Sequence, residues 1–224
     1  MNNAEITITA GERAETYRFF AGLCLKPPSE SFVAMIRDRS ILTELKIEKN
    51  SKGYAEMRDF VNEAAGMQDL QNELEAEHTA LFTLPSGVMP HEGVFLDKEM
   101  RLGGKVTVSV RQFYEKAGAE ILNGCIEMPD HLGIELEFMA FMSRMEAELR
   151  MKKDPSALQR CIELQAGFLE EHLLKWAYQC CEKILEKTSC GYYRAVAYLL
   201  MDFLKDEEEY VAGMFSGGKT IFMN

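Results

Sequence analysis

The sequence predicts an all-α protein. Apolar residues recur at helical spacing over most of the 224-residue chain, and no two alternating apolar runs flank a tight turn as a hairpin would require. Several of the helical runs begin at residues that cap helices well and end at proline or glycine. Hydrophobic residues make up 47% of the chain and charged residues 27%, which is the balance of an ordinary globular protein.

The first part of the chain contains helices with clear starts and stops. Thr9-Ala10-Gly11-Glu12 has the capping-box pattern, and apolar residues then follow at helical spacing until Pro27-Pro28 ends the run. Ser29 can cap a second helix, and the less regular stretch up to Gly53 should contain its end and a loop. Residues 54–65 and 69–82 predict two further helices.

Residues 83–105 predict a long irregular connection, because the periodicity stops there and proline and glycine recur. Loops of this length are uncommon in compact domains and often carry function. Residues 106–117 follow. They contain Val-Thr-Val-Ser-Val, which has strand propensity, but we predict a helix because no partner strand occurs elsewhere in the sequence.

The second half predicts three long helices. The first opens near His131 and runs to about Met151, with a wide apolar face that should lie in the core. Asp154-Pro155 supplies a cap and a first-turn proline for a helix reaching about Lys187, and the last helix covers residues 192–211. Residues 213–224 are expected to form a loose tail. No linker divides the sequence, so residues 1–224 are expected to form one domain.

Composition narrows the possible functions. The net charge of −11, from 36 acidic and 25 basic residues, disfavours nucleic-acid binding and favours a basic partner, unless the acidity only maintains solubility. The apolar runs are too short to span a membrane. The N-terminus lacks a secretory signal pattern, so a cytoplasmic location is expected, and the six irregularly spaced cysteines are expected to be reduced thiols.

Ionisable pairs suggest sites that their context does not support. Glu75-x-x-His78 has the spacing of a di-iron ligand pair. Such sites need two copies of this motif, and the sequence contains a single copy, so no metal site is predicted.

A second pattern is that of a P-loop, which Gly213-Met214-Phe215-Ser216-Gly217-Gly218-Lys219-Thr220 matches. It lacks the preceding strand and following helix that phosphate binding requires, so no cofactor is predicted.

The segment at residues 129–139 is the most informative. Asp130 would be a good N-cap for the helix that follows, and Glu135 stands four residues after His131, where its carboxylate could hold the imidazole. Helix capping would account for an aspartate at position 130 but not for a histidine at position 131. In the predicted helix over residues 155–187, Trp176 is expected to anchor the core and His172 to support packing.

Three blocks of sequence carry a family resemblance. They are Ala80-Leu81-Phe82 with Met89-Pro90-His91-Glu92, Pro129-Asp130-His131-Leu132 with Glu135-Leu136-Glu137-Phe138-Met139, and Phe168-Leu169-Glu170-Glu171-His172-Leu173-Leu174-Lys175-Trp176. In order and spacing the chain resembles the TorD/DmsD/NarJ family, cytoplasmic chaperones that mature molybdenum-containing redox enzymes. It departs from the family's Pro-Pro-Tyr-Glu-Ser by reading Met-Pro-His-Glu-Gly at residues 89–93, which leaves the client open.

The resemblance implies a chaperone that holds the apo catalytic subunit of a molybdopterin-dependent oxidoreductase and binds its twin-arginine leader peptide. It would assist cofactor insertion and restrain early export, acting as a monomer or homodimer. Some relatives are reported to bind GTP, so the resemblance leaves GTP as a possible ligand. The residues implied for peptide and client binding are Leu81, Phe82, Pro90, His91, Pro129, Asp130, His131 and Glu135. In that role Leu81 and Phe82 would give apolar contact and Asp130 would face a cation.

Two other classes of function fit the same residues. One is a small helical hydrolase or metal-dependent lyase that uses Asp130, His131 and Glu135, although no recognisable nucleophile motif accompanies them. The other is a helical scaffold that binds only folded partners. Such a scaffold would bind the mature client but not its leader peptide.

Overall fold

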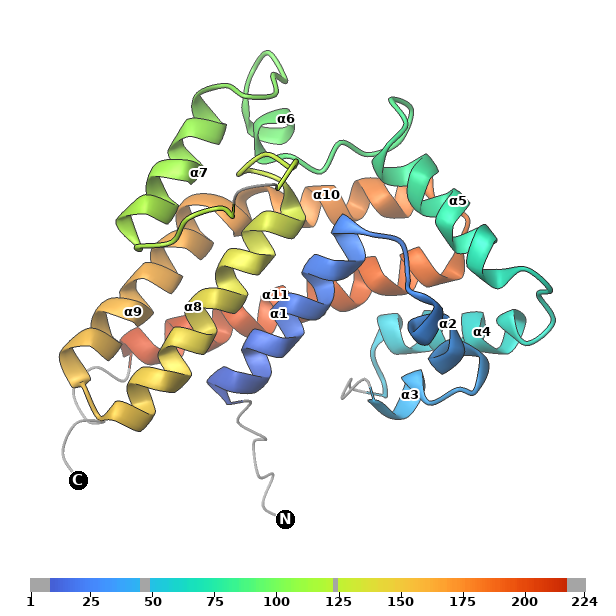
Figure 1. The fold of residues 1–224 in the computed structure, drawn as a ribbon, viewed down its shortest axis with the longest axis horizontal. Helices are drawn as coiled ribbons and strands as arrows, with labels where there is room; N and C mark the ends of the chain where they lie inside the picture. Colours follow the sequence, from blue (N-terminus) through green and yellow to red (C-terminus); the bar gives the residue numbers. More distant parts are fainter. Residues whose placement is uncertain (1–8, 45–48, 123–124, 217–224) are drawn as a thin grey trace.

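The computed structural model describes residues 9–44, 49–122 and 125–216, and within these ranges the chain forms helices and no strand (Figure 1). The predicted all-α fold is confirmed. The elements are α1 (Ala10–Leu25), α2 (Glu30–Arg37), α3 (Ile41–Glu44), α4 (Lys52–Ala64), α5 (Leu70–Phe82), α6 (Glu92–Leu96), α7 (Lys105–Lys116), α8 (Leu132–Lys152), α9 (Pro155–Phe168), the π-helical turn η1 (Leu169–Leu173), α10 (Leu174–Lys187) and α11 (Gly191–Ser216).

Several helices begin at the caps that the sequence predicts. The side chain of Thr9 accepts a hydrogen bond from the Glu12 N–H, and the Glu12 carboxylate accepts one from the Thr9 N–H, which completes the capping box of α1. The side chains of Ser29 and Asp154 cap α2 and α9 by accepting from the Phe32 and Ala157 N–H groups, and Pro155 occupies the first turn of α9. The side chain of Ser51 caps α4, which starts two residues earlier than residue 54.

Helix α8 lies in the middle of the molecule, alongside α1 and next to α9 (Figure 1). Its core-facing side chains Leu132, Leu136 and Met139 are fully buried, as the wide apolar face predicts. Helix α11 packs against α4, α9 and α10, and α10 in turn contacts α6. The position of α8 at the centre of the core is therefore as predicted.

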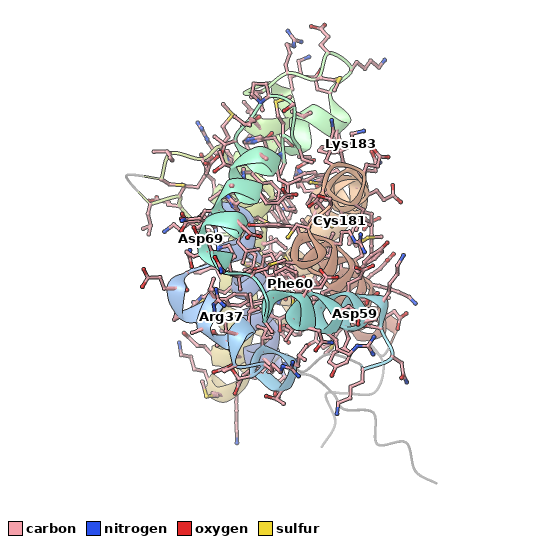
Figure 2. All side chains as sticks on the ribbon, turned by 90° about the vertical axis from the view of Figure 1, so that its right-hand side faces the viewer. Arg37, Asp59, Phe60, Asp69, Cys181 and Lys183 are labelled. Carbon is pink, nitrogen blue, oxygen red and sulfur yellow. The ribbon has the colours of Figure 1, made fainter. Side chains whose placement is uncertain are left out.

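Figure 2 shows the molecule turned by 90°, with the right-hand side of Figure 1 facing the viewer. Phe60 of α4 and Cys181 of α10 lie inside the structure, whereas Asp59 and Lys183, from the same two helices, lie on its surface.

Among the described residues, no helix combines the length and the apolar character needed to cross a bilayer. All six cysteines are free thiols, and Cys125 is the exposed one among them.

A buried guanidinium ties four helices together. Arg13 of α1 donates from Nε to Glu207 of α11 at 2.7 Å, from one terminal nitrogen to Glu146 of α8 at 2.8 Å, and from the other to Gln165 of α9 at 2.9 Å. Burial acts to lower the pKa of Arg13, but the hydrogen bond and charge of Glu207 outweigh it and hold the pKa above its ordinary value. The arginine is therefore a permanent cation in the core.

The structure corrects the sequence prediction in three places. The stretch 155–187 is interrupted by the π-helical turn η1, and the irregular connection 83–105 contains the short helix α6. Residues 213–216, predicted as part of a loose tail, belong to α11. The rest of that tail, with Lys219 and Thr220 of the P-loop-like pattern, lies outside the described residues. The single-domain organisation stays a prediction.

Candidate functional site

Two distant segments meet at the start of α8. The Glu92 N–H donates to the Asp130 carbonyl, and the Leu132 N–H donates to the Pro90 carbonyl, each at 2.8 Å. These bonds form an isolated antiparallel bridge between His91 and His131. The structure thus brings together two blocks that lie far apart in the sequence. We call this pairing of residues 90–92 with residues 130–132 the crossing.

His131, not Asp130, is the N-cap of α8. Its Nδ1 accepts a hydrogen bond from the Gly133 N–H at 3.0 Å. The prediction that Asp130 caps this helix is wrong: its Oδ2 accepts from the Gly93 N–H at 3.1 Å, in the first turn of α6. The physical reason is that α6 comes within reach of Asp130 only through the crossing, which local sequence does not reveal.

Asp130 is fully buried yet only partly satisfied. Its Oδ1 has no hydrogen-bond partner, and neither does Nδ1 of His91, which lies 3.8 Å away. Burial acts to raise the pKa of Asp130, but His91 and the Gly93 N–H outweigh it and hold the pKa below its ordinary value. The crossing therefore contains a buried negative charge.

The imidazole of His131 stays neutral, because burial, and then the neighbouring His91, lower its pKa to about 3. The two rings meet edge to face, with their centroids 5.0 Å apart. The predicted contact between His131 and Glu135 is wrong. Glu135 instead turns into the core, where its Oε2 accepts from Nε1 of Trp176 at 3.1 Å.

A second carboxylate lies beside Glu135. Both oxygens of Glu92 lie within 3.1 Å of Nδ1 of His172, and the other oxygen of Glu135 has no hydrogen-bond partner. Burial, followed by the charge of Glu92, raises the pKa of Glu135 well above its ordinary value. Trp176 and His172 are thus buried structural residues, as predicted, and they link α10 and η1 to the crossing.

Leu81 and Phe82 lie at the end of α5, beside this network rather than in the crossing. Leu81 is buried, and its carbonyl accepts from the Val88 N–H of the loop at 2.6 Å. Phe82 is half-buried and packs on His78 and Tyr193. These contacts make both residues part of the packing that supports the loop. Pro90, His91, Pro129, Asp130 and His131 are the predicted site residues that the structure brings together.

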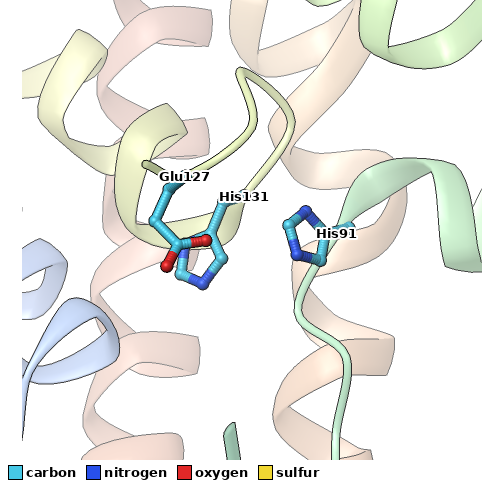
Figure 3. Close-up of side chains that lie close together, drawn as sticks. All are labelled: His91, Glu127 and His131. Carbon is cyan, nitrogen blue, oxygen red and sulfur yellow. The ribbon is translucent and has the colours of Figure 1, made fainter. Parts of the chain in front are cut away.

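The structure adds a residue that sequence reasoning missed. Glu127 is half-buried, and its carboxylate joins His91 and His131 in a group whose donor atoms all lie within 4.8 Å of one another (Figure 3). No sequence motif includes Glu127, because it lies several residues before α8. The turn between Glu127 and α8 is what brings its carboxylate close to the two histidines. Glu75 and His78 are not part of any such group in the described ranges: Glu75 hydrogen-bonds Gln71 instead.

Exposed apolar side chains flank the crossing. Met89, two residues before His91, is 43% exposed, and Ile126, next to Glu127, is 92% exposed. Leu84 and Leu122, on the same two segments, are also exposed. Such side chains mark a binding surface where they form a contiguous apolar patch.

Comparisons with known proteins place the sequence in a family. The family model described as nitrate reductase delta subunit matches residues 47–182. The chaperone protein TorD of Vibrio cholerae serotype O1 is 26% identical over 217 residues, covering 94% of this chain and 97% of the relative. TorD of Vibrio parahaemolyticus is 27% identical over 208 residues, covering 90% and 95%, and TorD of Aliivibrio fischeri is 26% identical over 215 residues, covering 93% and 99%.

These relatives are named as chaperones, a non-catalytic role, which supports a non-enzymatic function for the family. The hydrolase or lyase alternative is therefore set aside. The family match includes every block that carried the resemblance, and it extends over more than half of the sequence. The chain belongs to the nitrate reductase delta subunit family, the TorD/NarJ family.

Proposed function

We propose that this protein is a cytoplasmic chaperone for the apo catalytic subunit of a molybdopterin-dependent oxidoreductase. It binds the subunit's twin-arginine leader peptide at the crossing, keeps the subunit competent for cofactor insertion and restrains early export. The observation that carries this proposal is that the two segments that meet at the crossing carry exposed apolar side chains, Met89 and Ile126, and acidic groups, Glu127 and the buried Asp130.

The apolar part of a leader peptide has a surface to bind. Met89 and Leu84 lie on the segment between α5 and α6, and Ile126 and Leu122 lie on the segment before α8. A peptide helix lying between such side chains buries apolar area on both sides, which is how amphipathic helices bind in grooves. Methionine adapts its shape to different partners, which suits a client sequence of varied residues.

The arginines of the leader peptide can pair with the carboxylate of Glu127. Glu127 is half-buried, so its oxygens are accessible to a guanidinium, which pairs well with a carboxylate through two parallel hydrogen bonds. Asp130 lies below the surface and adds negative potential without direct contact. The net charge of −11 also attracts a basic peptide. Glu127 is thus the direct partner in this proposal, and Asp130 supports it.

The test is calorimetric titration with the leader peptide of the molybdoenzyme encoded nearest to this gene. Ile126→Ser and Met89→Ser should each weaken binding by about 1 kcal/mol, because apolar area buried by the peptide is lost. Met151→Ser is the matched control, since Met151 is 77% exposed on α8 but lies near the other end of that helix. Equal loss in all three variants would contradict a peptide site at the crossing.

The same titration separates the peptide chaperone from a scaffold for folded partners. A scaffold would bind the mature, cofactor-loaded enzyme and show no heat with the leader peptide. The proposed chaperone should bind the leader peptide and the apo subunit, and should lose affinity once the cofactor is in place. Binding of the mature enzyme alone would refute the proposal.

A further inference from the structure

The crossing also contains a candidate metal site, and it shares Glu127 with the proposed peptide site. His91, Glu127 and His131 come from the loop before α6, the segment before α8 and the cap of α8 (Figure 3). Their donor atoms lie within 4.8 Å of one another, and in the described part of the chain this is the group with that property. Two imidazoles and one carboxylate are donors that suit Zn²⁺ and related divalent ions.

The three donor atoms would have to move only slightly closer together to bind one ion. Four-coordinate zinc with bonds near 2.0–2.1 Å holds its donors roughly 3.3 Å apart. Glu127 and His91 are both half-buried, so their side chains can rotate toward a common point. His131 would bind through Nε2, the ring nitrogen that does not accept from the Gly133 N–H.

A second, independent observation points to a ligand at this place. His91 Nδ1 and Asp130 Oδ1 are both buried, both lack a hydrogen-bond partner and lie 3.8 Å apart. An ion bound at Nε2 of His91 would keep the proton on Nδ1, where it faces Asp130. This carboxylate, histidine and metal arrangement orients the ligand in many metal sites. The two atoms are 3.8 Å apart, so a small shift of the His91 ring on binding would bring them into hydrogen-bond distance.

We propose that His91, Glu127 and His131 bind one divalent transition-metal ion, Zn²⁺ in preference, with water in the open position. The site differs from the Glu75-x-x-His78 pair and the cysteines, on which the expectation of no metal rests. Binding through Nε2 of His131 would place the proton on Nδ1 and break its hydrogen bond with the Gly133 N–H. The ion would therefore loosen the first turn of α8 while tightening the loop.

The experiment titrates Zn²⁺, and separately Co²⁺, into the chelator-treated full-length protein. One equivalent should bind, and the Co²⁺ complex should show visible bands without the strong near-ultraviolet band of a thiolate ligand. His91→Gln and Glu127→Gln should each weaken Zn²⁺ binding about tenfold or more. Neither residue's side chain caps α8, so both variants should keep the parent's circular dichroism spectrum.

Two control variants exclude other sources of binding. Glu120→Gln removes an exposed carboxylate on a neighbouring segment, and Cys125→Ser removes the exposed thiol nearby. Both should bind Zn²⁺ as the parent does. The proposal is overturned if Cys125→Ser abolishes binding, if His91→Gln and Glu127→Gln bind like the parent, or if the parent takes up no more Zn²⁺ than Glu127→Gln.

Discussion

Asp130 and His131 are adjacent, yet their side chains serve different helices. His131 caps its own helix, α8, through Nδ1, while Asp130 accepts from the backbone of α6. The two residues together fix the angle at which the loop meets the start of α8. Substitutions at either one therefore affect the position of the loop as well as any direct contact with a partner.

Asp130→Asn should weaken leader-peptide binding by about 0.5–1 kcal/mol, and by less at high salt, because its buried charge acts on the peptide at a distance and not through a hydrogen bond. The amide oxygen can still accept from the Gly93 N–H, so the fold should be kept. Calorimetric titration at two salt concentrations measures the effect, and the melting temperature controls for folding. If the variant binds as tightly as the parent at low salt, the charge of Asp130 has only a structural role.

Glu135→Gln should raise the free energy of unfolding at pH 7–8 by about 1 kcal/mol. The folded-state pKa of Glu135 is raised by burial and by Glu92, so its contribution to stability is full below the unfolded value of 4.5 and is lost as pH rises through the folded pKa. The amide stays neutral and keeps an acceptor for Trp176. Urea unfolding at several pH values measures this.

The matched control is Glu137→Gln, an exposed glutamate on the same helix. It should leave stability within about 0.5 kcal/mol of the parent at each pH. A loss of stability in Glu135→Gln at pH 8, with Glu137→Gln unchanged, would show that the carboxylate at 135 stabilises the fold and would contradict the prediction.

At the scale of elements, sequence predicted most helices and their starts, because caps and apolar periodicity act locally. Thr9, Ser29 and Asp154 cap as expected. Sequence did not predict α6 or η1. Helix α6 has five residues, too few for periodicity, and it depends on Asp130 from another segment. The same limit applies to the site: its blocks were recognisable, but Glu127 and the roles of Asp130 and His131 depend on the crossing.

The contact between α4 and α11 depends on one small residue. A Cβ added at Gly53 would lie 2.5 Å from the Leu199 side chain and 2.9 Å from its backbone nitrogen. Gly53→Ala should therefore separate the two helices and destabilise the protein by about 1–3 kcal/mol. Chemical denaturation gives the change in the free energy of unfolding.

Gly22→Ala provides the comparison for that substitution. Gly22 also lies in a helix, α1, but a Cβ there meets nothing within 4 Å. Alanine should stabilise it by about 0.5–1 kcal/mol, because glycine loses more backbone entropy on folding. Destabilisation of the same size in both variants would mean that steric contact with Leu199 is not the cause at Gly53.

At the scale of the whole molecule, α1, α8, α9 and α11 are joined through Arg13. A buried ion pair contributes little net stability over apolar packing, but removing one partner leaves an uncompensated charge. The group also includes Tyr210 and Arg150, which donate to the other oxygen of Glu146. The helices around α8 thus share one set of charges, which must be intact for them to pack together.

This arrangement predicts loss of stability in acid. Burial acts to raise the pKa of Glu146, but hydrogen bonds from Tyr210 and the charge of Arg13 outweigh it and hold the pKa below 4.5. Its stabilising contribution is therefore full above the unfolded pKa and is lost as pH falls through the folded pKa. In Glu146→Gln, the melting temperature should be lower at pH 7 and should fall less steeply below pH 4.5 than in the parent.

Glu209→Gln is the control for the acid prediction, since Glu209 is an exposed carboxylate of α11. Its melting temperature should follow that of the parent from pH 7 down to the acid range. If Glu146→Gln and the parent lose stability with the same dependence on pH, acid sensitivity must come from other carboxylates.

The π-helical turn η1 also constrains how the chain length can change. An i→i+5 turn holds one residue more than an α-helical turn, so deleting one residue from η1 should convert it to α-helical geometry with little rotation of α10 relative to α9. Trp176 should then keep its contact with Glu135, and α10 its packing on α6. Glu170 and Glu171 are exposed, and one of them could be lost in this way. Deleting a second residue would rotate α10 by about 100°, so single-residue deletions should occur here among functional homologues while longer ones should be rare.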